Sequence, residues 1–381
     1  METTEKYKGF EQGPIRPPSE ASSLLIRVTR NCPWNKCIFC PVYKKRKFSI
    51  RPVEHVIKDI DSIKKHLEAI FDIAGEDKNI NRTELQNYIN SLSNNQMPAL
   101  NAAWHWFISG MKSIFIQDAN SLIIKPQDFI RILSHIKESF PFLKRITSYA
   151  RSHTVARISD QDMKELVKAG LNRIHIGLES GSDEVLSMVK KGADKNTHIK
   201  AGKKAVKAGA ELSEYVMPGL GGVKLSKTHA LETADALNQI NPHFIRFRTF
   251  AIRNENKLYK DEEFEKCNDV TTVKEILLLL QNLSGITSAI KSDHILNLFQ
   301  EVEGRLPEDK KKMTDILENF LSMTPEDQTL LRVGKRIGML GRVTEENLPS
   351  KLADIKKECE RLGITEHNAD QFIEEAMSRF I

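Results

Sequence analysis

The chain of 381 residues has a formal net charge of +6, with 40% hydrophobic and 28% charged residues, which is an ordinary globular composition. No apolar run is as long as a bilayer span, and the first residues lack the apolar stretch of a signal peptide. The five cysteines are odd in number and do not suggest a disulfide framework, so we expect a cytoplasmic protein in a reducing compartment.

Residues 1–23 predict an extended N-terminal arm, because Gly13-Pro14 and Pro17-Pro18 punctuate a stretch that has no apolar core of its own. We expect this arm to pack on the surface. The apolar run 24–29 predicts a strand that leads into a loop rich in cysteine.

Cys32, Cys37 and Cys40 lie within nine residues on this loop, and such a cluster indicates a metal site. Three thiolates can hold three irons of a 4Fe-4S cluster and leave the fourth iron open for a bound reactant. Structural zinc normally takes four protein ligands, so a zinc site completed by a distant His or Cys is the alternative. Cys267 and Cys359 lie far away in sequence typical of helices, and we expect neither to bind the metal.

The densest basic run, Lys44-Lys45-Arg46-Lys47, follows the cysteines directly. A run of this kind is usually a solvated loop. Attraction of an anionic substrate or a nucleic acid is the alternative, although no stacking aromatic residues are interleaved.

The next part of the chain predicts a long amphipathic helix, because apolar residues recur at helical spacing from Val53 to Ile70. Residues 72–110 predict a helical insertion whose two tryptophans we expect to be buried packing. From residue 113, strands and helices alternate regularly. The predicted strands are 113–117, 145–149, 173–178, 211–217 and 244–250, and the predicted helices are near 128–139, 159–170, from 182, 196–208 and 226–239.

With the first strand, this makes six strands alternating with helices over residues 24–255. Such alternation predicts an α/β fold with a parallel sheet, either a (β/α)6 partial TIM-like barrel or an open Rossmann-like sheet. From residue 256 the strand signals end, and residues 256–381 predict an all-helical C-terminal domain. Its predicted helices are 274–281, 309–323, 328–340, 352–362 and 369–380.

The cysteine loop resembles that of the radical S-adenosylmethionine (radical SAM) superfamily, where the usual gaps between cysteines are three and two residues. Phe39 occupies the aromatic position before the third cysteine, and the first gap here holds four residues, 33–36. The stretch 173–192 resembles the fourth-strand segment of the branch that contains oxygen-independent coproporphyrinogen oxidases and methylthiotransferases. The resemblance implies the partial (β/α)6 barrel, with the cysteine loop after the first strand.

The resemblance also implies that S-adenosylmethionine binds at the carboxyl ends of the strands, where ligands of parallel barrels gather. Glu179 matches a polar residue that contacts the ribose or the methionine part of the cofactor. Asp118 is expected to take the methionine amino group, and the alternative is a turn-forming role. Arg151 or Lys191 is expected to pair with the methionine carboxylate. The candidate cofactor-binding residues are Phe39, Asp118, Ser148, Arg151, Glu179, Ser180, Lys191 and Glu214.

Two further groups of polar residues follow. Arg246 and Arg248 alternate on the sixth strand, and if they are buried they need anionic partners from the protein or from a substrate. Asp293 and His294 are predicted catalytic residues that act on substrate, with His294 moving a proton. The alternative is that Asp293 caps a helix.

The resulting functional hypothesis is an enzyme that holds one 4Fe-4S cluster and cleaves S-adenosylmethionine reductively. The 5′-deoxyadenosyl radical would then abstract hydrogen from an unidentified substrate. An external one-electron reductant of the flavodoxin or ferredoxin type is the expected partner. The alternative from another class is a metal-stabilised binding protein without enzymatic activity, for example one that binds RNA. The sequence leaves open whether a small molecule, a nucleic acid or a protein is the substrate.

Overall fold

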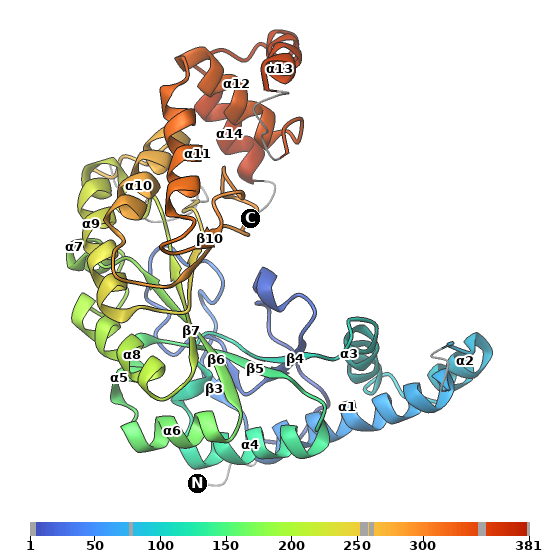
Figure 1. Cartoon of the computed structure of the whole chain (residues 1–381). Helices are drawn as coiled ribbons and strands as arrows, with labels where there is room; N and C mark the ends of the chain where they lie inside the picture. The colour runs from blue at the N-terminus through green and yellow to red at the C-terminus, as the bar shows by residue number, and fades with distance from the viewer. Residues whose placement is uncertain (1–4, 76–78, 252–257, 259–262, 342–347, 379–381) are drawn as a thin grey trace. The chain divides into compact units, whose positions relative to one another are not determined.

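The computed structural model describes residues 5–75, 79–251, 258, 263–341 and 348–378 (Figure 1). The chain divides into two compact units, which we describe separately. Unit 1 comprises Met1–Asn35, Val42–Ile176 and Lys204–Leu212, and unit 2 comprises Lys36–Pro41, Gly177–Lys203 and Ser213–Ile381. No helix in the described ranges combines the length and the apolar character needed to cross a membrane.

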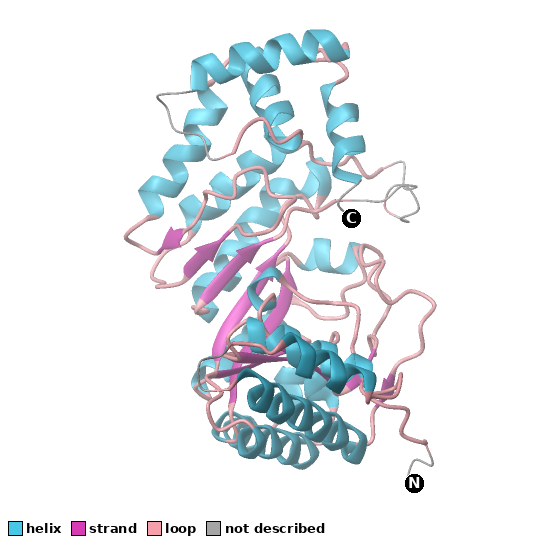
Figure 2. Ribbon diagram, turned by 90° about the vertical axis from the view of Figure 1, so that its right-hand side faces the viewer, coloured by secondary structure: helices cyan, strands magenta, loops and turns pink. Residues whose placement is uncertain are grey.

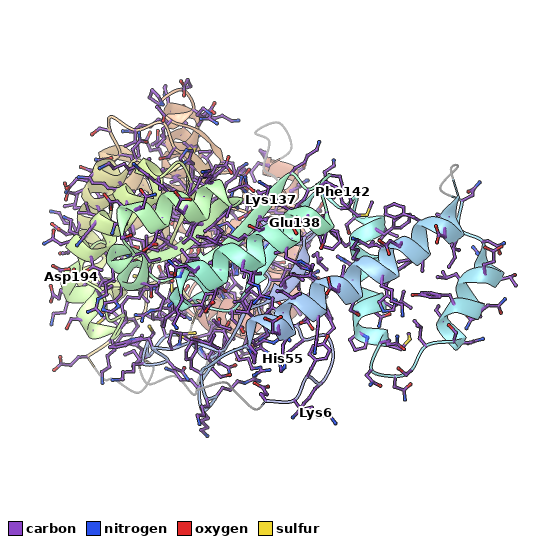
Figure 3. All side chains as sticks on the ribbon, turned by 90° about the horizontal axis from the view of Figure 1, so that it is seen from below. Lys6, His55, Lys137, Glu138, Phe142 and Asp194 are labelled. Atoms are coloured by element: carbon purple, nitrogen blue, oxygen red, sulfur yellow. The ribbon has the colours of Figure 1, made fainter. Side chains whose placement is uncertain are left out.

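The sheet of unit 1 contains the parallel strands β1 (Leu24–Arg27), β4 (Ser113–Gln117), β5 (Arg145–Ala150) and the first part of β6 (Leu171–Glu179). Side chains alternate between the two faces of a strand. One face carries fully buried isoleucines of neighbouring strands, such as Ile116 and Ile174, and the other carries Phe115 and His175. Helices α1 (Val53–Ala74), α4 (Pro126–Ser139) and α6 (Asp160–Lys168) pack side by side. Figure 3 shows the exposed Lys137 and Glu138 on α4.

The predicted insertion after α1 is helical. It forms α2 (Arg82–Asn90) and α3 (Met97–Ile108), and α3 packs against α1. Trp106 is fully buried with its ring edge-on to Phe140, so its predicted packing role is confirmed.

Unit 2 contains most of β7 (Glu211–Val216), with β8 (Phe244–Phe247), β9 (Ala289–Lys291) and β10 (Gly304–Arg305). Figure 2 draws the strands of the chain in magenta and its helices in cyan. Strands β7, β8 and β9 are parallel, and β10 is antiparallel to β9. Helix α9 (Gly222–Ile240) packs on α10 (Asp269–Asn282), which packs on α11 (Lys310–Ser322). Helix α12 (Pro325–Arg336) packs on α13 (Leu348–Leu362) and α14 (Ala369–Ser378). The remaining elements of the chain are η1 (Pro18–Glu20), β2 (Thr29–Arg30), β3 (Ser49–Ile50), η2 (Ser121–Ile123), α5 (Ser152–Arg157), α7 (Asp183–Met188) and α8 (Lys195–Lys207).

The strand order of the sheet is β1-β4-β5-β6-β7-β8-β9-β10, and the six predicted strands correspond to β1 and β4–β8. The predicted α/β fold class, parallel strands alternating with helices and then a helical C-terminal region, is confirmed. The short strands β9 and β10 lie where the sequence predicts only helices. They have three and two residues, too few for a period-two pattern to show, and Ile290 of β9 is fully buried beside β8.

The N-terminal arm is held more firmly than the expected surface segment. Glu11 pairs with Arg27 at 2.7 Å and with Arg30 at 2.8 Å. The Gln117 side chain accepts from the amide of Gly13 at 2.8 Å. Further along, Glu20 is completely buried and accepts from the Ser23 hydroxyl at 2.6 Å. Most of the described arm is exposed or half-buried, as expected of a segment packed on the surface, and it supplies partners to charged groups of the sheet, which need them.

Candidate functional site

The first half of the cysteine loop belongs to unit 1. The antiparallel pair β2–β3 closes the base of the loop, and the loop carries Cys32 between these strands. Asn31 and Asn35 take left-handed backbone conformations, with φ of 68° and 48°. The amide of Asn35 donates to the Cys32 sulfur at 3.4 Å, and its side chain donates to the carbonyl of Tyr43 at 2.6 Å. Asparagine tolerates this conformation better than most residues, and Asn35 lies inside the four-residue gap between Cys32 and Cys37.

Asp118 anchors the same half of the loop. It follows β4 with φ of 70°, and its side chain is fully buried. The carboxylate accepts from Arg27 Nε at 2.6 Å, the Tyr43 hydroxyl at 3.0 Å and the Asn31 amide at 3.2 Å. These donors come from β1 and from both sides of the cysteines, so Asp118 fixes where the loop starts and ends.

Arg151 lies against the loop in unit 1. Its guanidinium is 5.1 Å from the centre of the Trp34 ring, a cation–π contact with the residue inside the enlarged gap. Its amide donates to the Asn120 side chain at 3.0 Å, and the Asn120 side chain makes no capping hydrogen bond to the short helix that follows it. Ser148 pairs in register with Ile116 and Ile174, and its hydroxyl donates to the carbonyl of Tyr149 at 3.2 Å. It therefore lies on the apolar face of the sheet, a placement that does not support a cofactor contact.

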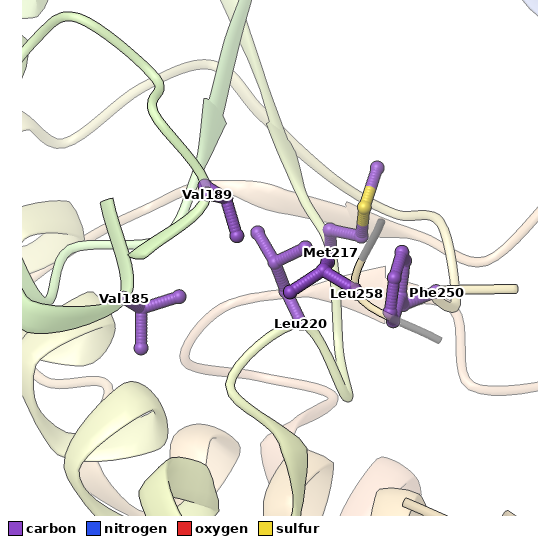
Figure 4. Close-up of a cluster of buried hydrophobic side chains, with 6 residues drawn as sticks. All are labelled: Val185, Val189, Met217, Leu220, Phe250 and Leu258. Atoms are coloured by element: carbon purple, nitrogen blue, oxygen red, sulfur yellow. The ribbon is translucent and has the colours of Figure 1, made fainter. Parts of the chain in front are cut away.

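The second half of the loop, with Cys37 and Cys40, belongs to unit 2. The amide of Ile38 donates to the carbonyl of Val189 at 3.0 Å, and the Cys37 sulfur lies 3.9 Å from the carbonyl oxygen of Lys191. Ile38 and Phe39 pack against a buried cluster. Figure 4 shows this cluster, which consists of Val185, Val189, Met217, Leu220, Phe250 and Leu258. The apolar core of unit 2 thus holds the segment that carries the two cysteines.

Three ionisable side chains of unit 2 influence one another near the carboxyl ends of β6 and β7. Glu179, the last residue of β6, has Oε1 3.2 Å from the ammonium of Lys191, and both side chains keep a small exposed fraction, 14% and 12%. Lys191 also lies 5.8 Å from the centre of the Phe39 ring. Glu214 on β7 is fully buried, and neither carboxyl oxygen has a hydrogen-bond partner in the described part of the chain.

Burial raises the pKa of Glu214 well above its usual value of 4.5. The Lys191 ammonium opposes this rise, and the Glu179 carboxylate adds to it. A buried carboxyl group without a partner is expensive, and such groups concentrate at functional sites. The group of Glu179, Lys191 and Glu214 therefore has two carboxyl groups for one ammonium, and it is suited to a ligand that brings hydroxyl or ammonium donors.

The backbone around Glu179 is constrained as well. Glu179 has φ of 63°, and a side-chain carbon added at Gly177 would overlap Glu179 Oε1. Its carbonyl accepts from the amide of Met217 at 2.9 Å and from His229 Nε2 at 3.2 Å. Sequence reasoning did not identify His229, although a histidine on the alanine-rich buried face of α9 is an unusual residue there.

The cysteine loop offers thiols as the donors for a cluster. The chain forms no disulfide among its five cysteines, all of which lie in the described ranges. Within those ranges, no three His, Cys, Asp or Glu side chains are grouped as they would be around a metal ion. Cys32 belongs to unit 1 and the other two to unit 2, so the chemistry of the donors, three thiols within nine residues, is what fits a 4Fe-4S cluster.

A family model of the radical SAM superfamily matches residues 26–234, more than half of the chain. The chain belongs to the radical SAM superfamily. This confirms the predicted superfamily. Radical SAM proteins in general use a 4Fe-4S cluster and S-adenosylmethionine. No curated protein matches the sequence.

Several solved structures are similar to this radical SAM chain. Elp3 of the archaeon Methanocaldococcus infernus, with an N-terminal deletion, is 16% identical with a TM-score of 0.40, over 54% of this chain and 54% of that one. Coproporphyrinogen III oxidase (HemN) of Escherichia coli is 14% identical with a TM-score of 0.43, over 68% of this chain and 50% of that one. Methylornithine synthase (PylB) is 12% identical with a TM-score of 0.43, over 78% and 81%. The chain spans about half the length of the first two proteins.

The predicted catalytic residues of this radical SAM chain lie outside any helix. Asp293 pairs with the buried Arg246 at 2.6 Å, so the anionic partner of that arginine comes from the protein, while Arg248 is exposed. The segment after Asp293 is irregular, and the alternative that Asp293 caps a helix is wrong. Burial, with the Arg248 guanidinium, lowers the pKa of His294 to about 4, so this imidazole is neutral at pH 7.

The partnerless Glu214 gives a testable effect on stability. A carboxyl group whose pKa is raised by folding is favourable at low pH, and its contribution is lost as the pH rises above the unfolded value of 4.5. Glu214→Gln should therefore raise the free energy of unfolding by about 1–3 kcal/mol at pH 8, with a smaller gain at pH 5. Urea unfolding of the protein without cluster or cofactor measures both values.

Glu211→Gln is the matched control for this change, because Glu211 lies on the same strand but is 44% exposed and paired with Arg173. We expect it to leave stability unchanged or slightly lower at both pH values. An equal or lower stability of Glu214→Gln at pH 8 would contradict the assignment of Glu214 as an unsatisfied buried group.

Proposed function

We propose that the protein is a radical SAM enzyme in which Cys32, Cys37 and Cys40 hold a 4Fe-4S cluster and S-adenosylmethionine binds at its open iron. When bound, the reduced cluster and the cofactor supply one electron and, by cleavage to methionine, a 5′-deoxyadenosyl radical that abstracts hydrogen from the substrate. The observation that carries the proposal is the family match over the segment that contains all three thiols.

The residues of unit 2 have defined tasks in this proposal. Glu179 accepts a hydrogen bond from the cofactor, and Lys191 either keeps Glu179 in place or pairs with the methionine carboxylate. Glu214 takes a hydroxyl or ammonium donor, which satisfies its buried carboxyl group. Phe39 holds the cysteine segment on the apolar core. Ser180, which follows Glu179, supports the turn after β6 by accepting from the amide of Ser182 at 3.0 Å.

In unit 1 the proposal gives Asp118 a positioning role in place of the expected cofactor contact. Its oxygens already accept from Arg27, Tyr43 and Asn31. Arg151 keeps its proposed role toward the methionine carboxylate, which the resemblance implies, because a guanidinium matches the geometry of a carboxylate. An external one-electron reductant of the flavodoxin or ferredoxin type would deliver the electron. The cytoplasmic location stays a prediction.

Asp293 and His294 stay predicted substrate-facing residues. The ion pair with Arg246 favours a structural task for Asp293, whose side chain remains 33% exposed. His294 is neutral at pH 7 and could accept a proton but would not be charged before the reaction. The substrate itself is open in this proposal.

The cluster assignment predicts which cysteines carry iron. After anaerobic reconstitution with iron and sulfide, the parent protein should hold about four irons and four sulfides per chain. Ala at Cys32, Cys37 or Cys40 should remove the charge-transfer absorbance and most of the iron, because three thiolates are the whole set of protein ligands. Iron analysis and visible absorbance measure this.

Cys267→Ala and Cys359→Ala are the matched controls, since both thiols are buried outside the loop. Burial also raises the pKa of Cys267 to about 12, which disfavours the thiolate that iron needs. Full iron content in Cys37→Ala would contradict the assignment, and one zinc per parent chain would favour the metal-stabilised binding protein instead.

The cofactor assignment predicts a selective loss of affinity in Glu179→Ala. Loss of a charge-assisted hydrogen bond costs about 1.5–3 kcal/mol, which is about ten- to a hundredfold in the dissociation constant of S-adenosylmethionine. The variant should keep the iron content of the parent. Calorimetry of the reconstituted proteins measures the affinity.

Glu232→Ala controls for the loss of a carboxylate, because Glu232 is 47% exposed and pairs with Lys195. We expect this variant to bind the cofactor as the parent does. An unchanged affinity in Glu179→Ala would move Glu179 to a structural role.

A further inference from the structure

A chain of buried polar contacts in unit 2 connects two helices with the backbone of Glu179. His229 of α9 has Nε2 3.2 Å from the carbonyl oxygen of Glu179 and Nδ1 3.0 Å from Glu275 Oε1. Glu275 belongs to α10, and both side chains are almost completely buried, with 1% and 2% exposed. Burying a histidine together with a carboxylate is costly, because both groups lose their contact with water, so such a pair needs an explanation.

Glu275 extends this connection to the turn after β7. Its Oε1 accepts from the amide of Gly219 at 2.7 Å, and its Oε2 accepts from the Ser226 hydroxyl at 2.6 Å. The carboxylate therefore joins α9, α10 and the turn that begins at Met217. The amide of Met217 in turn donates to the carbonyl of Glu179 at 2.9 Å, so the turn is also bonded to the backbone of Glu179.

A second contact of α9 holds the residues after Glu179. The Thr233 hydroxyl accepts from the amide of Gly181 at 2.8 Å. His229 and Thr233 are four residues apart on one face of the helix, so α9 supports the chain on both sides of Ser180.

The electrostatic balance favours a charged pair. Burial by itself lowers the pKa of His229, but the Glu275 carboxylate and the Glu179 carbonyl outweigh burial, and the net pKa is raised. The other titratable group beside Glu275 is Cys267, whose thiol stays protonated because burial raises its pKa to about 12. His229 is thereby held between the Glu275 carboxylate, 3.0 Å from Nδ1, and the Glu179 carbonyl, 3.2 Å from Nε2.

The backbone that this pair holds is strained. Glu179 has φ of 63°, a conformation that costs a residue other than glycine about 1–3 kcal/mol unless its surroundings impose it. Two donors on its carbonyl, the Met217 amide and His229, provide that support. The backbone conformation of Glu179 determines where its side chain points, and in the structure this side chain points toward Lys191.

We propose that His229 and Glu275 are positioning residues for S-adenosylmethionine: they hold Glu179 in its left-handed conformation and fix the turn from Met217 to Gly222. The inference rests on the proposed function, because it takes Glu179 to be a cofactor-binding residue. His229 acts through the backbone of Glu179, and Glu275 acts through His229 and the Gly219 amide. Neither residue needs to touch the cofactor.

A double-mutant cycle tests this in the full-length protein reconstituted with its cluster. His229→Leu removes both ring nitrogens and should weaken S-adenosylmethionine binding about tenfold. This loss should be equal to or smaller than the loss in Glu179→Ala. If His229 acts through Glu179, the double variant should bind no more weakly than Glu179→Ala alone. His229→Gln, which can still donate to the carbonyl, should recover part of the loss.

The matched control is His66→Leu. His66 of α1 is 1% exposed and bonded to the Tyr88 hydroxyl at 2.8 Å, so its loss removes a comparably buried histidine from unit 1. We expect parent-like affinity in this variant. Parent-like affinity in His229→Leu, or additive losses in the double variant, would overturn the proposal.

A second measurement needs neither cluster nor cofactor and keeps the inference separate from the proposed function. In hydrogen–deuterium exchange of the unreconstituted protein, His229→Leu and Glu275→Gln should speed exchange at the amides of Met217 and Gly219, and His66→Leu should not. Unchanged exchange at both amides would refute the positioning role even if the cofactor binds. Faster exchange in these two variants, together with a parent protein that does not bind S-adenosylmethionine, would support the positioning role and refute the proposed function.

Discussion

The imbalance of charge at the carboxyl ends of β6 and β7 is the constraint on which the candidate site depends. Glu179 and Glu214 share one ammonium, that of Lys191, and Glu214 is buried without a hydrogen bond among the described residues. A protein selected only for stability would replace Glu214 by an apolar residue of similar size. Its presence is understandable if a ligand with several donors completes the group, and S-adenosylmethionine carries an ammonium, a sulfonium charge and two ribose hydroxyls.

The surrounding architecture keeps this unfavourable group in place. Gly177 leaves room for the Glu179 carboxylate, since a side-chain carbon there would overlap it. Ile38 and Phe39 of the cysteine segment pack against the apolar cluster that includes Met217 and Leu220. In unit 1, Asp118 does comparable work for the first half of the loop, where it gathers Arg27, Asn31 and Tyr43. Each unit therefore anchors its part of the cysteine loop through its own strand ends.

Much of this arrangement could be predicted from the sequence. The spacing of the three cysteines, the alternation of strands and helices, and the position of Glu179 at the end of a strand are local properties, and local patterns survive folding. The sequence also predicts which face of β5 carries Ser148, because Ser148 lies two residues from Ile146 and must share its face. That parity already argued against a cofactor contact for Ser148.

Other features depend on partners that are distant in sequence. From the sequence, Asp118 is a candidate cofactor-binding residue at a strand end. In the structure its carboxylate accepts a hydrogen bond from Arg27, which is 91 residues away in the sequence. His229 can pair with Glu275 only because α9 packs on α10, and the sequence of either helix alone does not predict this pair. The strand β9 is three residues long, too short for periodicity to show. Long-range pairing of polar groups is therefore what sequence patterns missed here.

The central claim is that the three thiols hold a redox cluster that acts on S-adenosylmethionine. The most direct test is electron paramagnetic resonance of the reconstituted, reduced parent protein before and after addition of the cofactor, combined with analysis of the small-molecule products. The account predicts a 4Fe-4S signal that changes when S-adenosylmethionine is added, together with release of 5′-deoxyadenosine and methionine in equal amounts. A protein that takes up zinc in place of iron, or a cluster signal that the cofactor leaves unchanged with no 5′-deoxyadenosine formed, would contradict it.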